Sequence, residues 1–421
     1  MRKNILILFL FFFLLTASGI SGQIFDYRYH ESPAISWNGI NMSDTRQLSM
    51  GGISLFATGH SMQIANPALF SDTKGVEIGF TLNYIFYQSF QYWGINEGVR
   101  RYENPFSENT FFPSSISARF GFSGFSISAG WYRRSLNDFP DFSIVNKYDH
   151  DQNDEFNGSF SGFNESYFIS MGIPLSDKLN AGLKFEYMRG ERNAEIADQS
   201  SYYYYLDGYY QLKDKRSAYT ETNSAEVIIP ELGLIYDIDP KMRAGIRLRY
   251  PLKGKVKRKI IRSLSNSDGL NIFDDYIFED DHFEVPEAAA GLTYRLEGFR
   301  IFGSPGKLTA GVELEYRKWS DYKFIFFGEE EVRDLSDTIK FSFGAEYAKD
   351  LNKVDLFFRL GFALDIQPVK EPGTILKNYS TGIGIRYKEV QAGIGLLYSH
   401  GSTGGIPQDH FIVCTSLSKI L

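Results

Sequence analysis

The sequence predicts an all-β protein: a fourteen-stranded antiparallel transmembrane β-barrel with an N-terminal hatch (plug). From residue 75 onward, segments of about ten residues keep an apolar residue at every second position, the period of a strand with two unlike faces. The connections between these segments tend to alternate between long and short, and aromatic residues gather near both ends of the apolar face. A soluble sandwich could give any one segment, so the prediction depends on the three observations together.

The composition excludes several other classes of protein. The chain has 421 residues, 43% hydrophobic and 23% charged, with a mean hydropathy of -0.24, which excludes a bundle of membrane helices. Aromatic residues make up 16%, too many for a disordered chain. The net charge of -7 argues against a nucleic-acid partner, and a single cysteine, Cys414, excludes a disulfide framework and a cysteine-based zinc site.

Residues 1–22 are predicted to be a signal peptide. Arg2 and Lys3 precede eleven apolar residues, Ile5 to Leu15, and a stretch of small residues follows. The alternative, a transmembrane anchor, needs about 17 to 25 apolar residues. Cleavage after Gly19 and cleavage after Gly22 both fit. Because a signal peptide directs secretion, the mature protein is expected to be exported.

The barrel is expected to occupy residues 75–421. Odd-numbered strands are followed by long links such as 135–162 and 191–222, and even-numbered strands by tight turns such as 237–240. An even strand count with short turns on one side and long loops on the other is typical of a bacterial outer-membrane barrel. The expected strands are 75–88, 113–121, 124–134, 163–173, 178–190, 223–237, 241–252, 284–297, 307–319, 337–348, 353–365, 378–387, 390–400 and 410–420.

The charged residues decide which face of each strand meets lipid. Arg243, Arg247 and Arg249 alternate with apolar residues, and a lipid-facing arginine costs roughly 2 to 4 kcal/mol near the midplane. We therefore expect the arginines in the lumen and the apolar stripe in lipid. Aromatic residues of the stripe are expected to form two girdles, one at each membrane interface. The girdle at the outer ends of the strands contains Tyr84, Trp131, Tyr187, Tyr250, Tyr316 and Tyr398, and the girdle at the inner ends contains Tyr236, Tyr294, Tyr347 and Tyr387.

Residues 23–74 lack the period of two and are rich in Gly, Ser and Asn, which suits a segment folded inside a wide barrel. Several motifs here and later in the chain resemble the FadL/TodX family of long-chain fatty-acid and hydrocarbon transporters. They are Leu48-Ser49-Met50-Gly51-Gly52, Ala57-Thr58-Gly59-His60, Asn66-Pro67-Ala68-Leu69, Pro230-Glu231-Leu232-Gly233-Leu234, Val285-Pro286-Glu287-Ala288, Gly291-Leu292-Thr293-Tyr294 and Tyr316-Arg317-Lys318-Trp319-Ser320-Asp321.

The resemblance implies a bacterial outer-membrane barrel, plugged by residues 23–74, that takes up hydrophobic molecules by passive diffusion. Related barrels serve protein secretion, so a scaffold or shuttle in secretion is the alternative. A general polar pore is disfavoured because a filled lumen blocks water. The expected partners are a hydrophobic small-molecule ligand and outer-membrane lipid and lipopolysaccharide, and the protein is expected to be a monomer. The resemblance assigns the hatch residues Gly51, Gly52, Asn66, Pro67 and Ala68 and the barrel motif Pro286, Trp319, Ser320 and Asp321.

Two sets of candidate residues have alternative interpretations. Asn66-Pro67 could be only a turn, since Asn before Pro is a common turn starter. Arg243, Arg247 and Arg249 could bind a ligand carboxylate or could pair with lumen carboxylates such as Glu313 and Glu315.

A basic run, Lys253 to Lys259, could contact lipopolysaccharide or form a solvated strand extension, neutralised by the acidic stretch Asp274 to Asp281. A calcium bridge there lacks the spaced ligands of a defined loop. No catalytic motif is present, and the six histidines are scattered. Neither an enzymatic activity nor a metal site nor a cofactor is expected.

Overall fold

The computed structural model describes most of the chain from residue 44 onward. The described residues are 44–57, 61–69, 75–90, 100–101, 105–136, 139–147, 153–206, 209–266, 271–282, 285–301, 304–321, 324–326, 329–331, 335–366, 368, 375–403 and 406–421. The predicted signal peptide and the first part of the predicted hatch segment, residues 1–43, lie outside them.

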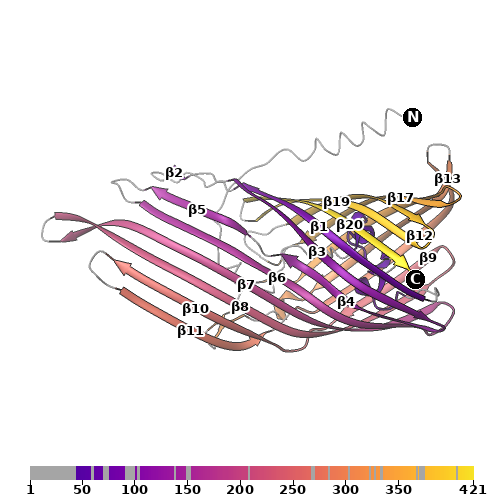
Figure 1. The fold of residues 1–421 in the computed structure, drawn as a ribbon, viewed down its shortest axis with the longest axis horizontal. Helices are drawn as coiled ribbons and strands as arrows, with labels where there is room; N and C mark the ends of the chain where they lie inside the picture. Colours follow the sequence, from indigo (N-terminus) through magenta and orange to yellow (C-terminus); the bar gives the residue numbers. More distant parts are fainter. Residues whose placement is uncertain are drawn as a thin grey trace.

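Fourteen antiparallel strands close into a barrel, as the sequence predicts. The barrel strands are β1 (Gly75–Phe90), β3 (Pro105–Phe122), β4 (Phe125–Leu136), β6 (Asn153–Pro174), β7 (Leu179–Leu206), β8 (Tyr209–Asp237), β9 (Met242–Arg249), β12 (Glu287–Ile301), β13 (Ser304–Arg317), β16 (Thr338–Asp350), β17 (Val354–Ile366), β18 (Ile375–Tyr387), β19 (Val390–Thr403) and β20 (Ile406–Ile420). Closure comes from β1, which pairs with β3 on one edge and with β20 on the other (Figure 1). Pairing of the first barrel strand with the last removes the two terminal edges that an open sheet would have.

Two of the long links expected from the sequence are largely strand. Residues 191–222 continue β7 and β8, which stay in register out to Leu206 opposite Tyr209, and β6 already begins at Asn153. Pairing the two strands satisfies their backbone hydrogen bonds, so the ladder extends past the point where the apolar alternation stops. Figure 1 shows these strands projecting far beyond the rest of the barrel.

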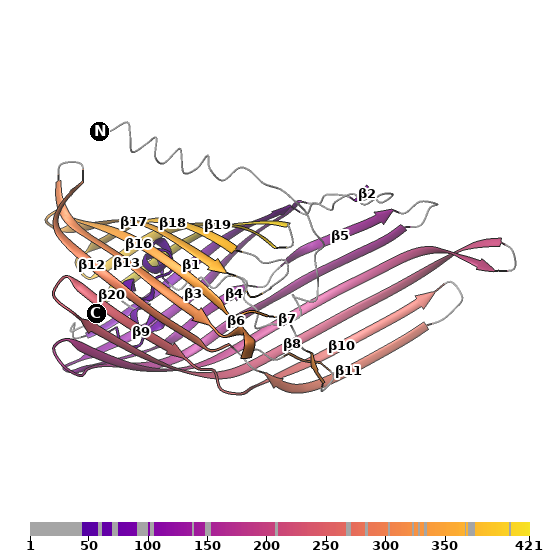
Figure 2. The ribbon, with the colours of Figure 1, turned by 180° about the vertical axis from the view of Figure 1, so that it is seen from behind.

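A second hairpin accompanies this projection. β10 (Gly254–Asn266) pairs with the outer part of β8, whereas β9 pairs with its inner part, and β11 (Asn271–His282) pairs with β10. The hairpin lies beside β7 and β8, away from the barrel proper (Figure 2). Four further short strands are β2 (Arg100–Arg101), β5 (Phe139–Lys147), β14 (Phe324–Phe326) and β15 (Glu329–Glu331).

The two faces of the barrel strands differ as the sequence predicts. On β9, Ile246 and Leu248 are 48% and 49% exposed on the outer face, whereas Arg249 is 1% exposed in the lumen. Tyrosines of both girdles are exposed on the outer face, for example Tyr250 and Tyr236. Tyr347 differs, because it is buried against Gly306 of the neighbouring strand.

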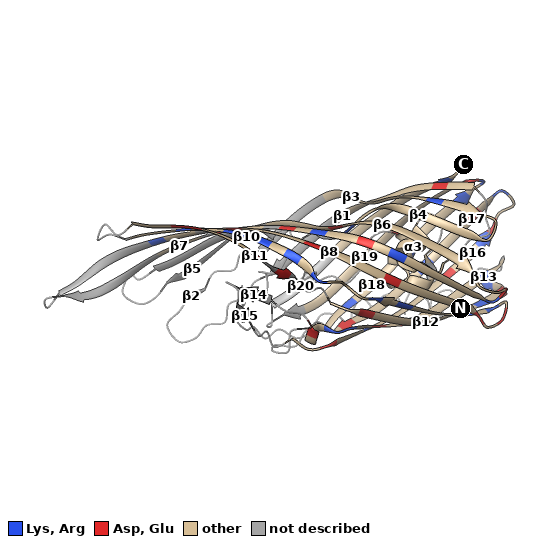
Figure 3. Ribbon diagram, turned by 90° about the horizontal axis from the view of Figure 1, so that it is seen from below, with Lys and Arg blue, Asp and Glu red and all other residues tan. Residues whose placement is uncertain are grey.

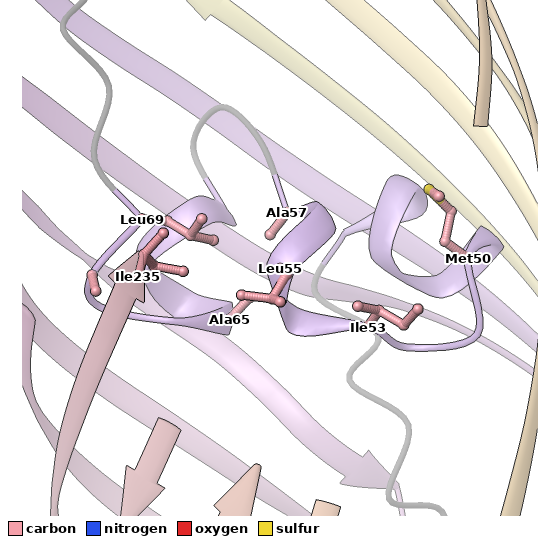
Figure 4. Packing of buried hydrophobic residues seen from close by; sticks show 8 residues of the cluster. Met50, Ile53, Leu55, Ala57, Ala65, Leu69 and Ile235 are labelled. Atoms are coloured by element: carbon pink, nitrogen blue, oxygen red, sulfur yellow. The ribbon is translucent and has the colours of Figure 1, made fainter. Parts of the chain in front are cut away.

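An inner segment, defined as residues 44–57 and 61–69, lies inside the barrel (Figure 2). It contains the helices α2 (Thr45–Ser49), η2 (Ser54–Phe56) and α3 (Met62–Ala65). Its apolar side chains pack on one another and on Ile235 of β8, as Figure 4 shows. None of the helices in the described part of the chain is long and apolar enough to cross a membrane.

Candidate functional site: the barrel lumen

The inner segment is seated in the barrel wall at places where the wall has no side chain. Gly172, Gly182 and Gly233 lie opposite one another in the ladders of β6, β7 and β8. A Cβ atom added at Gly182 would lie 2.1 Å from the backbone of Pro67, and one at Gly233 would lie 2.1 Å from Oδ1 of Asn66. Only glycine permits so close an approach of the inner segment to the wall.

A second row of glycines receives the other end of the inner segment. Gly344 of β16 and Gly361 of β17 are paired in register, and the backbone of Met50 and Gly51 lies directly against them. Gly51 and Gly52 have φ values of 74° and 85°, in the left-handed region that favours glycine. These conformations turn the chain at the wall, and the Gly51 N–H donates to Oγ of Ser380 at 3.1 Å.

Asn66, Pro67 and Ala68 form a turn, and the turn is also part of the seat. Oδ1 of Asn66 accepts a hydrogen bond from the Ala68 N–H at 3.0 Å, and its Nδ2 donates to the Ile246 carbonyl at 3.3 Å. The motif is therefore a turn, and the same turn holds the inner segment against the wall. Asn66 and Ala68 are almost fully buried.

Buried charges of the wall also hold the inner segment. The Arg46 guanidinium donates to both oxygens of Glu346 at 2.8 and 2.6 Å, and Arg359 donates to the same carboxylate at 2.8 Å. Nζ of Lys184 donates to the Ile64 carbonyl at 2.8 Å. Charge-assisted hydrogen bonds of this kind are stronger than neutral ones, so the segment is fixed at both its ends.

Glu313 binds the middle of the inner segment. One oxygen of its carboxylate accepts from the Ser54 N–H at 2.9 Å and from the Ser54 hydroxyl at 2.6 Å. Leu55 follows directly and packs against Gly245 and Gly291 of the wall. Glu313 therefore caps the start of η2 and does not pair with the arginines of β9, as the sequence had suggested it could.

A continuous chain of ion pairs runs around the lumen wall between β7 and β17. Neighbouring charges along it are 2.6 to 3.9 Å apart. Its members are Glu231, Lys184, Glu186, Arg249, Glu287, Arg247, Glu315, Arg317 and Asp365. Buried charges without partners are costly, and the alternation of sign along the chain avoids that cost.

The three arginines proposed for ligand binding all have carboxylate partners. Arg247 contacts Glu315 at 2.8 Å, Arg249 contacts Glu287 at 3.1 Å, and the half-exposed Arg243 contacts Asp237 at 2.7 Å. The arginines therefore pair with carboxylates. Glu315 is a partner that the sequence predicted, whereas Glu287 and Asp237 take the place of Glu313. The sequence could not identify these partners because they depend on strand register.

The basic run begins at Lys253, just before β10, continues along β10 and faces the acidic stretch of β11. Lys253 and Lys255 contact Asp281 at 2.5 and 3.2 Å, and Lys259 contacts Asp275 at 3.9 Å. The hydrogen bond from Lys253 holds the pKa of Asp281 below its usual range. Blue and red segments accordingly lie close together on these strands in Figure 3. The run is a strand extension neutralised by its neighbour, and contact with lipopolysaccharide stays a prediction.

The barrel motif lies at the outer end of β13. Trp319 is buried in the short helix η4 (Trp319–Asp321), and the carbonyl of Pro286 accepts from the Lys318 N–H at 3.0 Å. The Ser320 N–H donates to Asp337 at 2.8 Å, and Asp321 pairs with Lys318 at 2.9 Å. The motif joins the end of β13 to its neighbours, away from the inner segment. The described residues contain no cluster of three or more potential metal ligands.

Comparison with known proteins gives a family and a fold. A family model named BamG matches residues 1–385. The chain belongs to the BamG family. No curated protein matches its sequence significantly.

Solved structures show the same fold as this BamG-family chain at low sequence identity. The toluene transporter TodX of Pseudomonas putida is 14% identical, with a TM-score of 0.62 over 91% of this chain and 99% of that one. A FadL homologue of Pseudomonas aeruginosa is 13% identical, with a TM-score of 0.59 over 95% and 100%. The monoaromatic hydrocarbon channel CymD is 14% identical, with a TM-score of 0.58 over 91% and 99%.

These likenesses confirm, at the level of fold, the FadL/TodX resemblance predicted from the motifs. Together with the exposed apolar belt and its aromatic girdles, they identify this BamG-family chain as a bacterial outer-membrane barrel.

Proposed function

We propose that this barrel takes up hydrophobic molecules, of the long-chain fatty-acid or hydrocarbon class, by passive diffusion through a plugged lumen. The observation that carries the proposal is the inner segment seated in the glycine rows of a FadL/TodX-type barrel. A lumen occupied in this way is unsuited to a general polar pore, which needs a continuous column of water. No catalytic role is proposed.

The inner segment also builds an apolar cluster inside the barrel, and its side chains are almost fully buried. Met50, Ile53, Leu55, Leu69 and Ile235 form one cluster in the lumen (Figure 4). Burying each methylene of an acyl chain contributes roughly 0.8 kcal/mol, so most affinity for a hydrophobic ligand would come from apolar contacts of this kind. In this proposal Arg247 and Arg249 stabilise the wall through their carboxylate partners, and a ligand reaches the apolar cluster only when the inner segment moves.

The proposal is tested by what the protein carries and what it admits. Barrels purified gently should retain acyl chains or hydrocarbons detectable by mass spectrometry. Expression in a host without its own long-chain fatty-acid channel should restore uptake of labelled oleate, with uptake of a short polar solute as the control. Absence of bound lipid together with unchanged oleate uptake would contradict the proposal.

A scaffold or shuttle in protein secretion is the second candidate, and one observation favours it. The paired outer parts of β6, β7, β8, β10 and β11 project well beyond the barrel and present a broad sheet. Transport of small molecules gives no evident reason for so large a projection. If gently purified barrels co-purify with proteins and not with lipids, and exported proteins accumulate in a deletion strain, this candidate replaces uptake.

A further inference from the structure

The barrel wall splits between β3 and β4 near its outer end. The ladder between β3 and β4 runs from Phe122 opposite Phe125 to Ser115 opposite Tyr132 and stops there. Both strands continue outward on other partners: β3 pairs with β1 as far as Pro105, and β4 pairs with β6 as far as Leu136. Beyond Ser115 and Tyr132, therefore, no hydrogen bonds of this ladder join β3 to β4.

Arg133 occupies this split, surrounded by aromatic rings. Its guanidinium carbon lies 5.5 Å from the ring centroid of Phe112, 5.6 Å from that of Trp131 and 5.4 Å from that of Phe163. The face of an aromatic ring attracts a cation at these distances. The N–H donors of a guanidinium point outward in its plane, so stacking on rings leaves them available to an anion.

Arg133 has no acidic partner among the residues that the structure describes. Glu165 lies directly opposite it in the β4–β6 ladder, yet its two oxygens accept from the Trp131 indole at 3.0 Å and the Tyr167 hydroxyl at 3.2 Å. Nε of Arg133 is buried and makes no hydrogen bond to any described residue. Arg46, Arg247, Arg249, Arg317 and Arg359, by contrast, each contact a carboxylate.

The surroundings of the split indicate which anion fits. Trp131 and Tyr167 are aromatic residues at the outer end of the lipid-facing stripe, the depth at which polar head groups of a bilayer lie. Ile116, opposite Trp131 in the ladder, and Phe120 continue an exposed apolar surface toward the membrane interior. A cation at head-group depth above an apolar surface suits a molecule with an anionic head and an acyl tail.

We propose that Arg133 binds the anionic head group of an amphiphile in the split between β3 and β4, with the acyl tail lying along the outer wall below it. The head is a carboxylate or a phosphate, either of which matches the guanidinium donors. As a site for cargo, the split rests on the proposed uptake of long-chain molecules, since a fatty-acid anion would be held there at the membrane surface.

The test compares an acid and its neutral analogue. Binding of oleate and of oleyl alcohol is measured by equilibrium dialysis on barrels in neutral detergent, for wild type, Arg133→Gln and Arg133→Lys. Arg189→Gln is the matched control, because Arg189 is also an outer-face arginine but has its own partner, Glu191, at 3.3 Å. Unheated gel mobility shows whether each variant is folded.

Arg133→Gln should weaken oleate binding by about tenfold or more and leave oleyl alcohol unchanged, because only the charge-assisted contact is lost. Arg133→Lys, which keeps the charge and loses the planar fork, should fall between it and wild type. Arg189→Gln should match wild type for both compounds. Unchanged oleate binding in Arg133→Gln, or an equal loss of oleyl alcohol, excludes Arg133 as a site for a carboxylate head.

A second arm separates a fatty acid from a membrane lipid. Barrels in nanodiscs of phosphatidylglycerol and phosphatidylcholine are compared for the lipid they retain on extraction. If Arg133→Gln lowers retention of the anionic lipid only and leaves oleate unchanged, the head group belongs to a membrane lipid. If neither anion depends on Arg133, the inference is overturned while oleate uptake by the wild type can still stand. If the wild type takes up no oleate but Arg133-dependent binding persists, the proposed function fails and the head-group site remains.

Discussion

At the scale of single residues, glycine decides where the inner segment can sit. A lumen glycine is usually ascribed to the curvature of the wall, but several here leave room for another part of the chain. A Cβ atom at Gly182 would clash with the backbone of Pro67, which cannot rotate away as a side chain can. At Gly393 the nearest atom is 2.6 Å away, but it is Oγ1 of Thr45, the end of a side chain that can turn.

This difference predicts unequal effects of one methyl group. Gly182→Ala should displace residues 66–68 from the wall and raise the ion conductance of barrels in planar bilayers, whereas Gly393→Ala should stay as closed as wild type. Both variants should still insert and show heat-modifiable gel mobility. Equal conductance in the two variants would show that the contact at Gly182 does not keep the lumen closed.

Lys184 illustrates how a buried charge depends on its partners. Its side chain is 1% exposed and contacts Glu231 at 2.9 Å. Lys184→Met leaves the buried Glu231 and Glu186 without this cation, and breaking such a pair from one side costs about 3 to 5 kcal/mol. The temperature at which the folded gel band disappears should therefore fall clearly.

The double variant Lys184→Met with Glu231→Gln should recover much of that loss, because it removes both charges. A double variant no more stable than the single one would mean that the contact of Lys184 with the Ile64 carbonyl, and not its ion pair, carries the effect.

At the scale of elements, the sequence predicted every barrel strand but not how far β6, β7 and β8 extend outward. Alternation is visible only where the two faces of a strand meet different surroundings. β16 keeps its pattern over most of its length, with Ile339, Phe341 and Phe343 exposed between buried residues. Beyond Gly190 of β7 and its partner Ala225 of β8, we infer that both strands leave the lipid belt, so the requirement for an apolar face ends while the pairing continues. The missing signal was thus hydrogen bonding, which sequence does not display.

The outer hairpin gives a test of orientation. An epitope tag inserted between Leu206 and Tyr209, where β7 ends and β8 begins, should be reached by antibody on intact cells. A tag in the tight turn at Asp239, at the other end of β8, should be reached only after the outer membrane is permeabilised. The tagged proteins should insert equally well. Labelling in the opposite sense would invert the assignment of both girdles.

At the scale of the whole molecule, fold and site were predictable to different extents. Strand number and lumen face could be inferred from local sequence, whereas the assignment of Gly51, Gly52 and Asn66 to a hatch depended on the family resemblance and stays a prediction. The pairing of Arg249 with Glu287 and of Arg46 with Glu346 could not be inferred, because each joins residues brought together only by closure and register. The same holds for the split at Arg133, which depends on where one ladder ends.

Ion conductance after removal of the inner segment shows whether this segment closes the barrel. Deletion of residues 23–68 leaves all fourteen barrel strands intact, so the protein should insert and keep its heat-modifiable mobility. Glu313, Glu346 and Lys184 would then face an emptied, hydrated lumen. We expect steady ion conductance for this variant in planar bilayers and a closed wild type. A deleted barrel that inserts and stays closed would contradict this expectation, and would assign closure to the external parts of the chain.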